Sequence, residues 1–178
     1  SVLCDSSNSD IIIVGSVGGG VWKTINANSN SPTWVNKSDQ LALSITGLAC
    51  DKYNKNKLVA VTGHGTAFQT GADFNDGIIV SSDNGESWSK KYITLNSNKI
   101  ALDANTVICY NDNIFVGSHV NLRKDNFGSL PPEYGKGGVW KSSDFGDNWT
   151  LCNILSGDND LLLVSSLEIG ENDCLYAA

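Results

Sequence analysis

The sequence predicts an all-β protein built as a β-propeller, and three observations support this prediction. A glycine-led segment recurs from Gly20, Gly77 and Gly138, at spacings of about 57 and then about 61 residues. Each complete unit contains four short β-rich runs that are separated by turn residues. No stretch shows convincing helical periodicity. Four antiparallel strands per repeat, at a period of this order, are typical of a propeller blade.

The first two strands of each unit are predicted from apolar runs on either side of a turn. β-branched and apolar residues favour strands, whereas the Asn and Asp residues between them favour turns. The expected strand pairs are 1–4 with 10–16, 45–50 with 57–62, 106–110 with 113–118, and 161–167 with 173–178.

The third and fourth strands are joined by a hairpin with the pattern Ser-x-Asp-x-Gly-x-x-Trp. The aspartate can accept backbone N–H groups of the turn, and the glycine supplies the positive φ of a tight hairpin. The tryptophan starts the outer strand, and we expect all five tryptophans to pack in the core or between blades. The first copy is degenerate, because Asn26 replaces the aspartate and the turn before Trp34 is longer. The pattern residues are Ser81, Asp83, Gly85, Trp88, Ser142, Asp144, Gly146 and Trp149.

The repeat divides the chain into about three and a half blades, which we expect at 1–39, 45–93, 98–155 and, for the half blade, 161–178. The chain contains no methionine and its last unit stops after two strands, so we expect a processed chain or a piece of a larger propeller. Open sheet faces would favour association with the remaining blades of a longer chain or with other subunits.

The repeated hairpins resemble the Asp-box, or BNR, repeat. This repeat occurs in sialidases, in xyloglucan-cleaving glycoside hydrolases, in sortilin-type receptor domains and in a photosystem II assembly factor. The segments 5–10, 14–16 and 18–24 are also similar to such repeats, so the resemblance covers essentially the whole chain. It implies the propeller fold and a ligand site on the face opposite the Asp-box hairpins. It implies no particular activity, because unrelated proteins share this structural hairpin.

On that opposite face we expect the loops between the second and third strands. The first loop, 17–19, is minimal, but 63–76 and 119–136 are long, and long loops on a rigid scaffold commonly contain binding residues. The ligand-face candidates are His64, Gln69, Asn75, His119, Arg123, Asn126 and Tyr134. His64 and His119 are predicted to occupy equivalent positions, either as ligand groups or, as we favour, as hydrogen-bonding caps of a strand end.

Catalysis by this face would need two carboxylates, since a glycosidase uses one as proton donor and one as base or nucleophile. Solvated loop carboxylates without a catalytic role are the favoured alternative. A complete sialidase site is excluded, because it would need three arginines and Arg123 is the single arginine of the chain. No cofactor motif and no metal site are recognised. The catalytic candidates are Asp73, Asp76, Asp125 and Glu133.

Charge and cysteine content limit the partners and the compartment. The formal net charge of −7 argues against nucleic acid and against polybasic membrane contacts, and no apolar run approaches the roughly 20 residues of a membrane span. Five cysteines leave at least one thiol unpaired, and Cys4, Cys50 and Cys109 are predicted to be small buried residues at matching positions. Free thiols favour a reducing compartment, whereas the family resemblance implies an extracellular one. The localisation therefore stays open.

Two functions are consistent with the sequence. The favoured one is a non-enzymatic binding or structural module that presents its loops to a protein or a glycan. The alternative is part of a secreted, xyloglucanase-like glycoside hydrolase that uses paired loop carboxylates.

Overall fold

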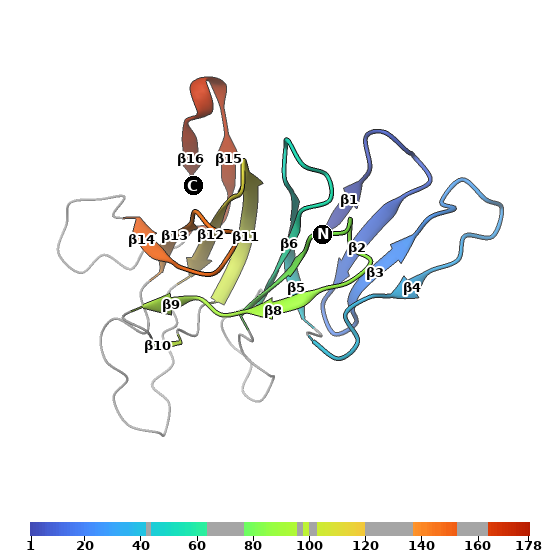
Figure 1. The fold of residues 1–178 in the computed structure, drawn as a ribbon, viewed down its shortest axis with the longest axis horizontal. Coiled ribbons are helices and arrows are strands. Elements are labelled where there is room, and N and C mark those ends of the chain that lie inside the picture. Colours follow the sequence, from blue (N-terminus) through green and yellow to red (C-terminus); the bar gives the residue numbers. More distant parts are fainter. Residues whose placement is uncertain (42–43, 64–76, 96–97, 100–102, 120–136, 153–163) are drawn as a thin grey trace.

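The computed structural model of the chain describes residues 1–41, 44–63, 77–95, 98–99, 103–119, 137–152 and 164–178 (Figure 1). The structure confirms an all-β, propeller-type architecture. Three four-stranded antiparallel sheets follow one another in chain order, and a two-stranded hairpin comes after them. Within the described part, no helix is long and apolar enough to cross a membrane.

Each sheet consists of four strands that are consecutive in the sequence. The first sheet contains β1 (Val2–Cys4), β2 (Ile12–Ser16), β3 (Gly20–Thr24) and β4 (Val35–Asn36). The second sheet contains β5 (Ile45–Cys50), β6 (Leu58–Thr62), β7 (Ile78–Ser81) and β8 (Ser89–Lys91). The third sheet contains β11 (Asp103–Tyr110), β12 (Asn113–His119), β13 (Gly138–Ser142) and β14 (Thr150–Cys152).

Two smaller antiparallel pairs complete the described structure. The first is β9 (Thr94–Leu95) with β10 (Asn98–Lys99). The second is the C-terminal hairpin of β15 (Leu167–Ile169) and β16 (Leu175–Ala177), whose turn contains a short 3₁₀ helix, η2 (Glu171–Asp173).

One expected strand is displaced. The sequence predicted a strand over 161–167, but β15 starts at Leu167. Residues Ser165 and Ser166 both donate their backbone N–H to the carbonyl oxygen of Ala178, and such shared bonding does not continue a regular ladder. Residues 161–163 lie outside the described part. The proposed blade boundaries are not decided by these strand limits.

Apolar residues fill the spaces between consecutive sheets. The space between the first and second sheets, called here the first junction, is filled from both sides by Ile13, Val21, Ile45, Leu48, Leu58, Ala60, Ile79 and Trp88. The space between the second and third sheets, the second junction, contains Val59, Val61, Ile78, Val80, Val107, Ile114, Val116, Trp140 and Trp149. Full burial of such a side chain stabilises the fold by about 1.5–3 kcal/mol.

The hairpins between the third and fourth strands are organised around one aspartate each. In the second sheet, Oδ1 of Asp83 accepts the Ser81 hydroxyl at 2.7 Å and the Ser87 N–H at 2.9 Å. The Gly85 N–H in turn donates to the Ser81 hydroxyl at 2.8 Å, from a backbone with a φ of 78°. Ser142, Asp144 and Gly146 repeat these contacts in the third sheet. In the first sheet, Asn26 accepts the Thr24 hydroxyl and the Thr33 N–H in the same way.

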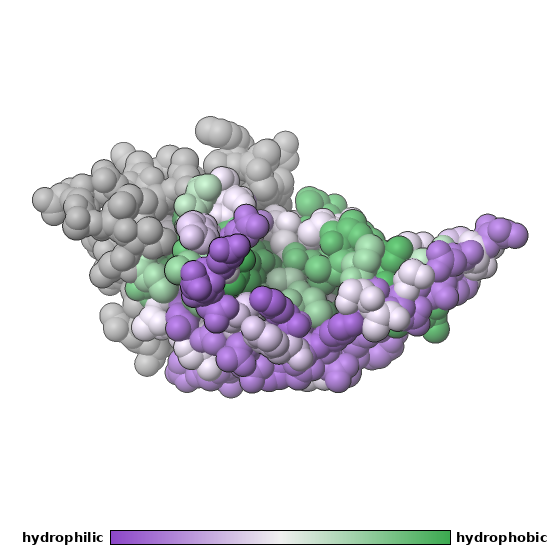
Figure 2. Space-filling view, turned by 90° about the horizontal axis from the view of Figure 1, so that it is seen from above, coloured by the Kyte–Doolittle hydropathy of each residue, from purple (hydrophilic) through white to green (hydrophobic). Residues whose placement is uncertain are grey.

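Trp34 contradicts the expectation that every tryptophan is packed. It is 41% exposed, whereas Trp88 and Trp149 are 9% and 8% exposed at the matching positions. These two rings lie against the preceding sheet, and no described element lies in front of the first sheet. Most exposed large aliphatic residues belong to this same sheet or its connections, namely Val2, Val17, Ile25 and Val35. Seen from above, hydrophobic residues gather in the middle of the molecule and hydrophilic ones line one long margin (Figure 2).

Candidate functional site

The loops that contain the predicted site connect β6 to β7 and β12 to β13. Most of the predicted residues lie outside the described part of the chain. His119 is the exception, since it ends β12 and its backbone pairs with Asp103 of β11. The residues outside the described part are His64, Gln69, Asp73, Asn75, Asp76, Arg123, Asp125, Asn126, Glu133 and Tyr134.

The two loops leave and rejoin their sheets at closed stems. The Thr62 hydroxyl donates to the carbonyl oxygen of Gly77 at 2.6 Å, and the Ser118 hydroxyl donates to that of Gly138 at 3.3 Å. Gly77 has a φ of 88°, and a Cβ at this position would lie 2.3 Å from the carbonyl oxygen of Lys91. Only glycine fits such a position. The stems of both loops are therefore closed by hydrogen bonds and lie at the same end of adjacent sheets.

The strand register bears on the predicted equivalence of the two histidines, of which His64 lies outside the described part. Val61 pairs with Ile78, and Thr62 then bonds to Gly77, just as Ser118 pairs with Gly138. This register aligns His119 with Gly63, one residue before His64.

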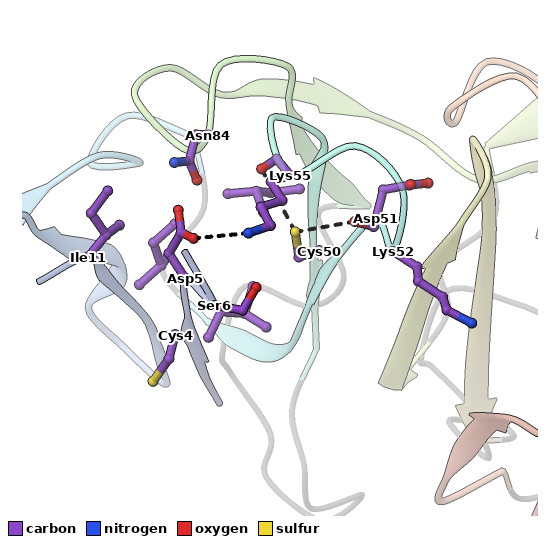
Figure 3. A pocket seen from close by; sticks show the side chains of 12 residues that line it. Cys4, Asp5, Ser6, Ile11, Cys50, Asp51, Lys52, Lys55 and Asn84 are labelled. Atoms are coloured by element: carbon purple, nitrogen blue, oxygen red, sulfur yellow. Dashed lines mark hydrogen bonds and ion pairs between the residues drawn. The ribbon is translucent and has the colours of Figure 1, made fainter. Parts of the chain in front are cut away.

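The opposite end of the sheets contains a crevice of about 230 Å³ at the first junction (Figure 3). Three segments form its walls: the β1–β2 turn, the β5–β6 turn and the tip of the β7–β8 hairpin. Its floor is apolar and its rim is charged. The lining residues are Leu3, Cys4, Asp5, Ser6, Ile11, Ile13, Cys50, Asp51, Lys52, Lys55, Leu58 and Asn84.

Asp5 and Lys55 form an ion pair across the crevice (Figure 3). Oδ1 of Asp5 accepts the Ser7 hydroxyl at 2.6 Å, the Ser7 N–H at 2.8 Å and the Lys55 ammonium at 3.5 Å. These contacts, with the Ser7 hydroxyl as the largest contribution, lower the pKa of Asp5 to about 2. Asp5 is 11% exposed and Lys55 is 48% exposed. The crevice thus presents a carboxylate that is ionised at neutral pH beside an accessible lysine side chain.

The three cysteines at matching positions are free thiols but differ in exposure. Cys109 faces the second sheet and is buried, and Cys50 faces the first sheet and is half-buried. Cys4 is exposed, which contradicts the predicted burial, because no described sheet lies in front of it. Burial, followed by the charge of Asp51, raises the pKa of the Cys50 thiol. The Cys50 thiol is therefore protonated at neutral pH and is a poor nucleophile.

The carboxyl groups with shifted pKa values in the described part all shift downward. The group comprises Asp5, Asp51, Asp83, Glu86 and Asp144. A general acid at neutral pH needs the opposite shift. The described part of the chain also contains no cluster of three or more His, Cys, Asp or Glu side chains placed to hold a metal ion. The described part thus provides a scaffold and a crevice rather than an acid–base pair.

Sequence reasoning missed the two aspartates at the junctions, Asp5 and Asp51. The signal was present, since each follows a matching cysteine directly, while Tyr110 follows the third one. Pairing between turns of different repeats was the missing information. Asp51 is 2% exposed and accepts donors from two different turns.

No family model matches the chain, and neither does any curated protein. Solved structures do match. The chain is similar to an ancestral GH74 enzyme, with a TM-score of 0.64 and 24% identity over 99% of this chain and 21% of that one. It is also similar to the GH74 enzyme of Niastella koreensis, with a TM-score of 0.53 and 20% identity over 87% of this chain and 21% of that one. The chain thus spans about a fifth of these enzymes, and the likeness shows that its fold is of the propeller type.

Proposed function

We propose that the chain is a non-enzymatic propeller module that presents the loops 63–76 and 119–136 to a glycan or a protein. The observation that supports this proposal is the pair of closed stems at Gly77 and Gly138, which fix the origins of both loops at one end of adjacent sheets. The units 1–39, 45–93, 98–155 and 161–178 are its blades. A rigid scaffold with long loops is a common basis for recognition.

Binding to a panel of soluble β-glucans, xyloglucan and their oligosaccharides would test the module. Isothermal titration should show saturable binding to one of them, or else an affinity screen for protein partners should recover one that the loops contact. Substitution of Arg123 or Tyr134 by alanine should weaken that binding by about tenfold. The matched control is Tyr53→Ala, an exposed tyrosine at the opposite end of the sheets. Binding that only the control weakens would contradict the proposal.

The second candidate function is glycoside hydrolysis, which the likeness to two GH74 enzymes favours. The acid and the base or nucleophile would come from Asp73, Asp76, Asp125 and Glu133. Release of reducing sugar from xyloglucan and β-glucans would identify this activity, and alanine at one of the four should then lower it at least about a thousandfold. Asp112→Ala is the control, since Asp112 pairs with Lys57 at the other end. Turnover that survives all four substitutions would exclude these carboxylates.

A further inference from the structure

The two junctions place an aspartate at the same position. Cys4 pairs with Ile12 and Cys50 pairs with Leu58, and an aspartate follows each cysteine directly. Each aspartate accepts the N–H of the residue two positions later, at 2.8 Å in both cases. Asp5 and Asp51 therefore begin their turns in the same way.

At the second junction, the β11–β12 turn of the third sheet supplies a further hydrogen-bond donor to the carboxylate of Asp51. The β11–β12 turn has two residues, Asn111 and Asp112, with φ values of 48° and 65°. Two positive φ values in a two-residue loop define a tight hairpin that keeps close to the sheet. Its Asp112 N–H donates to Oδ2 of Asp51 at 2.9 Å, and the thiol of Cys109 lies 3.5 Å from the same oxygen. Both carboxylate oxygens of Asp51 are thus occupied.

At the first junction, the corresponding donor is absent. The turn that faces Asp5 runs from Asp51 to Lys57 and is longer than its counterpart. Its N–H groups are used within the turn: Asn56 donates to the side chain of Asn54 at 3.1 Å, and Lys57 donates to the carbonyl oxygen of Asn54 at 2.9 Å. All hydrogen bonds that the described residues donate to the Asp5 carboxylate end on Oδ1, and Oδ2 accepts none of them. The crevice lies where the second junction is closed.

We propose that this crevice binds a small apolar α-amino acid. The ammonium group of the ligand donates to the unoccupied Oδ2 of Asp5, and its carboxylate accepts from Lys55, whose side chain is 48% exposed. The side chain lies on the apolar floor. Charge supports a zwitterion over a simple cation or anion, because the crevice presents one carboxylate and one ammonium, those of Asp5 and Lys55. A volume of about 230 Å³ suits a residue of the size of leucine, and the floor consists of Leu3, Ile11, Ile13 and Leu58.

This site lies at the opposite end of the sheets from the loops and goes beyond the proposed function. The test is isothermal titration of the full chain with L-leucine up to about 10 mM. We expect one saturable site, with binding at least about tenfold weaker for N-acetyl-L-leucine, which has no ammonium, and for L-leucine amide, which has no carboxylate. Backbone amide NMR shifts at Asp5 and Cys50, rather than at the loop stems, would place the ligand in the crevice.

Asp5→Asn is the decisive variant, since the amide oxygen can still accept the Ser7 N–H while the charge is lost. It should weaken leucine binding about tenfold and leave the melting temperature within a few degrees of wild type. Asp112→Asn, at the second junction, should bind leucine as the wild type does. If Asp5→Asn fails to fold, Lys55→Met provides the test, because it should abolish the preference for leucine over leucine amide. No saturable binding, or binding that neither substitution alters, would overturn the proposal.

Discussion

The first and second junctions use matching residues but close differently. In the second junction, a two-residue turn reaches across to Asp51, so that one carboxylate joins two sheets. In the first junction, a longer turn bonds to itself, and Asp5 stays beside an open crevice. The apolar packing between the sheets is continuous in both. Turn length, rather than sheet packing, therefore decides whether this end of a junction is closed.

The hairpins between the third and fourth strands, called here the outer hairpins, show the opposite difference: their contacts are more buried in the first junction than in the second. In the first junction, Lys23 is 4% exposed and donates to the carbonyl oxygen of Asn84 at 2.6 Å and to Glu86 at 2.7 Å. In the second junction, Lys91 pairs with Asp147, and both side chains are more exposed, at 30% and 60%. The first junction is thus stabilised mainly by contacts of the outer hairpin. The second is stabilised mainly by contacts between the turns that join the first and second strands of each sheet, called here the inner turns.

The largest effect should follow from Asp51→Ala. This substitution leaves the N–H groups of Tyr53, Asn54 and Asp112 without their acceptor, and a buried unsatisfied donor costs about 1–3 kcal/mol. We expect a loss of about 3 kcal/mol in the free energy of unfolding, measured in urea. Asp5→Ala is the matched control and should lose about 1 kcal/mol, since only the local turn and a partly exposed ion pair with Lys55 depend on it. Equal losses would show that the two junctions do not differ at their inner turns.

Lys23→Met should have the next largest effect. The buried ammonium makes two hydrogen bonds to the neighbouring hairpin, and its removal leaves the Asn84 carbonyl oxygen without this donor. We expect a loss of about 2 kcal/mol. Lys91→Met, which removes the exposed ion pair to Asp147 at the second junction, should lose under about 1 kcal/mol, because exposed ion pairs contribute little. A larger loss for Lys91→Met than for Lys23→Met would show that the outer hairpin contributes more to the second junction than to the first, which contradicts the comparison.

Acid should weaken the hairpins of both junctions to a similar extent. The hydroxyl of Ser87 lowers the pKa of Asp83 to about 2, and the N–H of Asn148 does the same for Asp144. A lowered pKa in the folded state stabilises the protein above the unfolded value of about 3.9, and this stability is lost as the pH falls toward 2. Urea midpoints between pH 5 and pH 2 should therefore decrease. Asp83→Asn and Asp144→Asn should each reduce this decrease by a similar amount. Clearly different reductions would show that the two hairpins contribute unequally to stability.

The strand pattern of this fold was predictable because it is local. Alternating apolar runs, turn residues and the Ser-x-Asp-x-Gly hairpin act within a few residues, and β5 was predicted with its observed limits. Exposure of Cys4 and Trp34 was not predictable in this way. Their counterparts are buried or half-buried against the preceding sheet, so their burial depends on a neighbour and not on the repeat itself.

The candidate site shows the same limit. The loops were recognisable as insertions between repeats, whereas the alignment of His119 with Gly63 follows only from the strand register. The crevice depends on how the turn after β5 meets the turn after β1, which are far apart in the sequence. Only the Cys-Asp pairs at Cys4 and Cys50 indicated that the inner turns share a role.

The smallest expected difference, without any change in stability, concerns the thiols of the two junctions. Burial, followed by the charge of Asp51, raises the pKa of Cys109 far above that of a free thiol, whereas Cys50 lines the open crevice and is only half-buried. A thiol–disulfide reagent at pH 8 should modify Cys50 slowly in the folded protein and leave Cys109 unmodified until the protein unfolds. Mass spectrometry after digestion would distinguish the two, in a Cys4→Ser background that removes the exposed crevice thiol. Equal rates would mean that the second junction opens as readily as the first, and the comparison between a closed and an open junction would then fail.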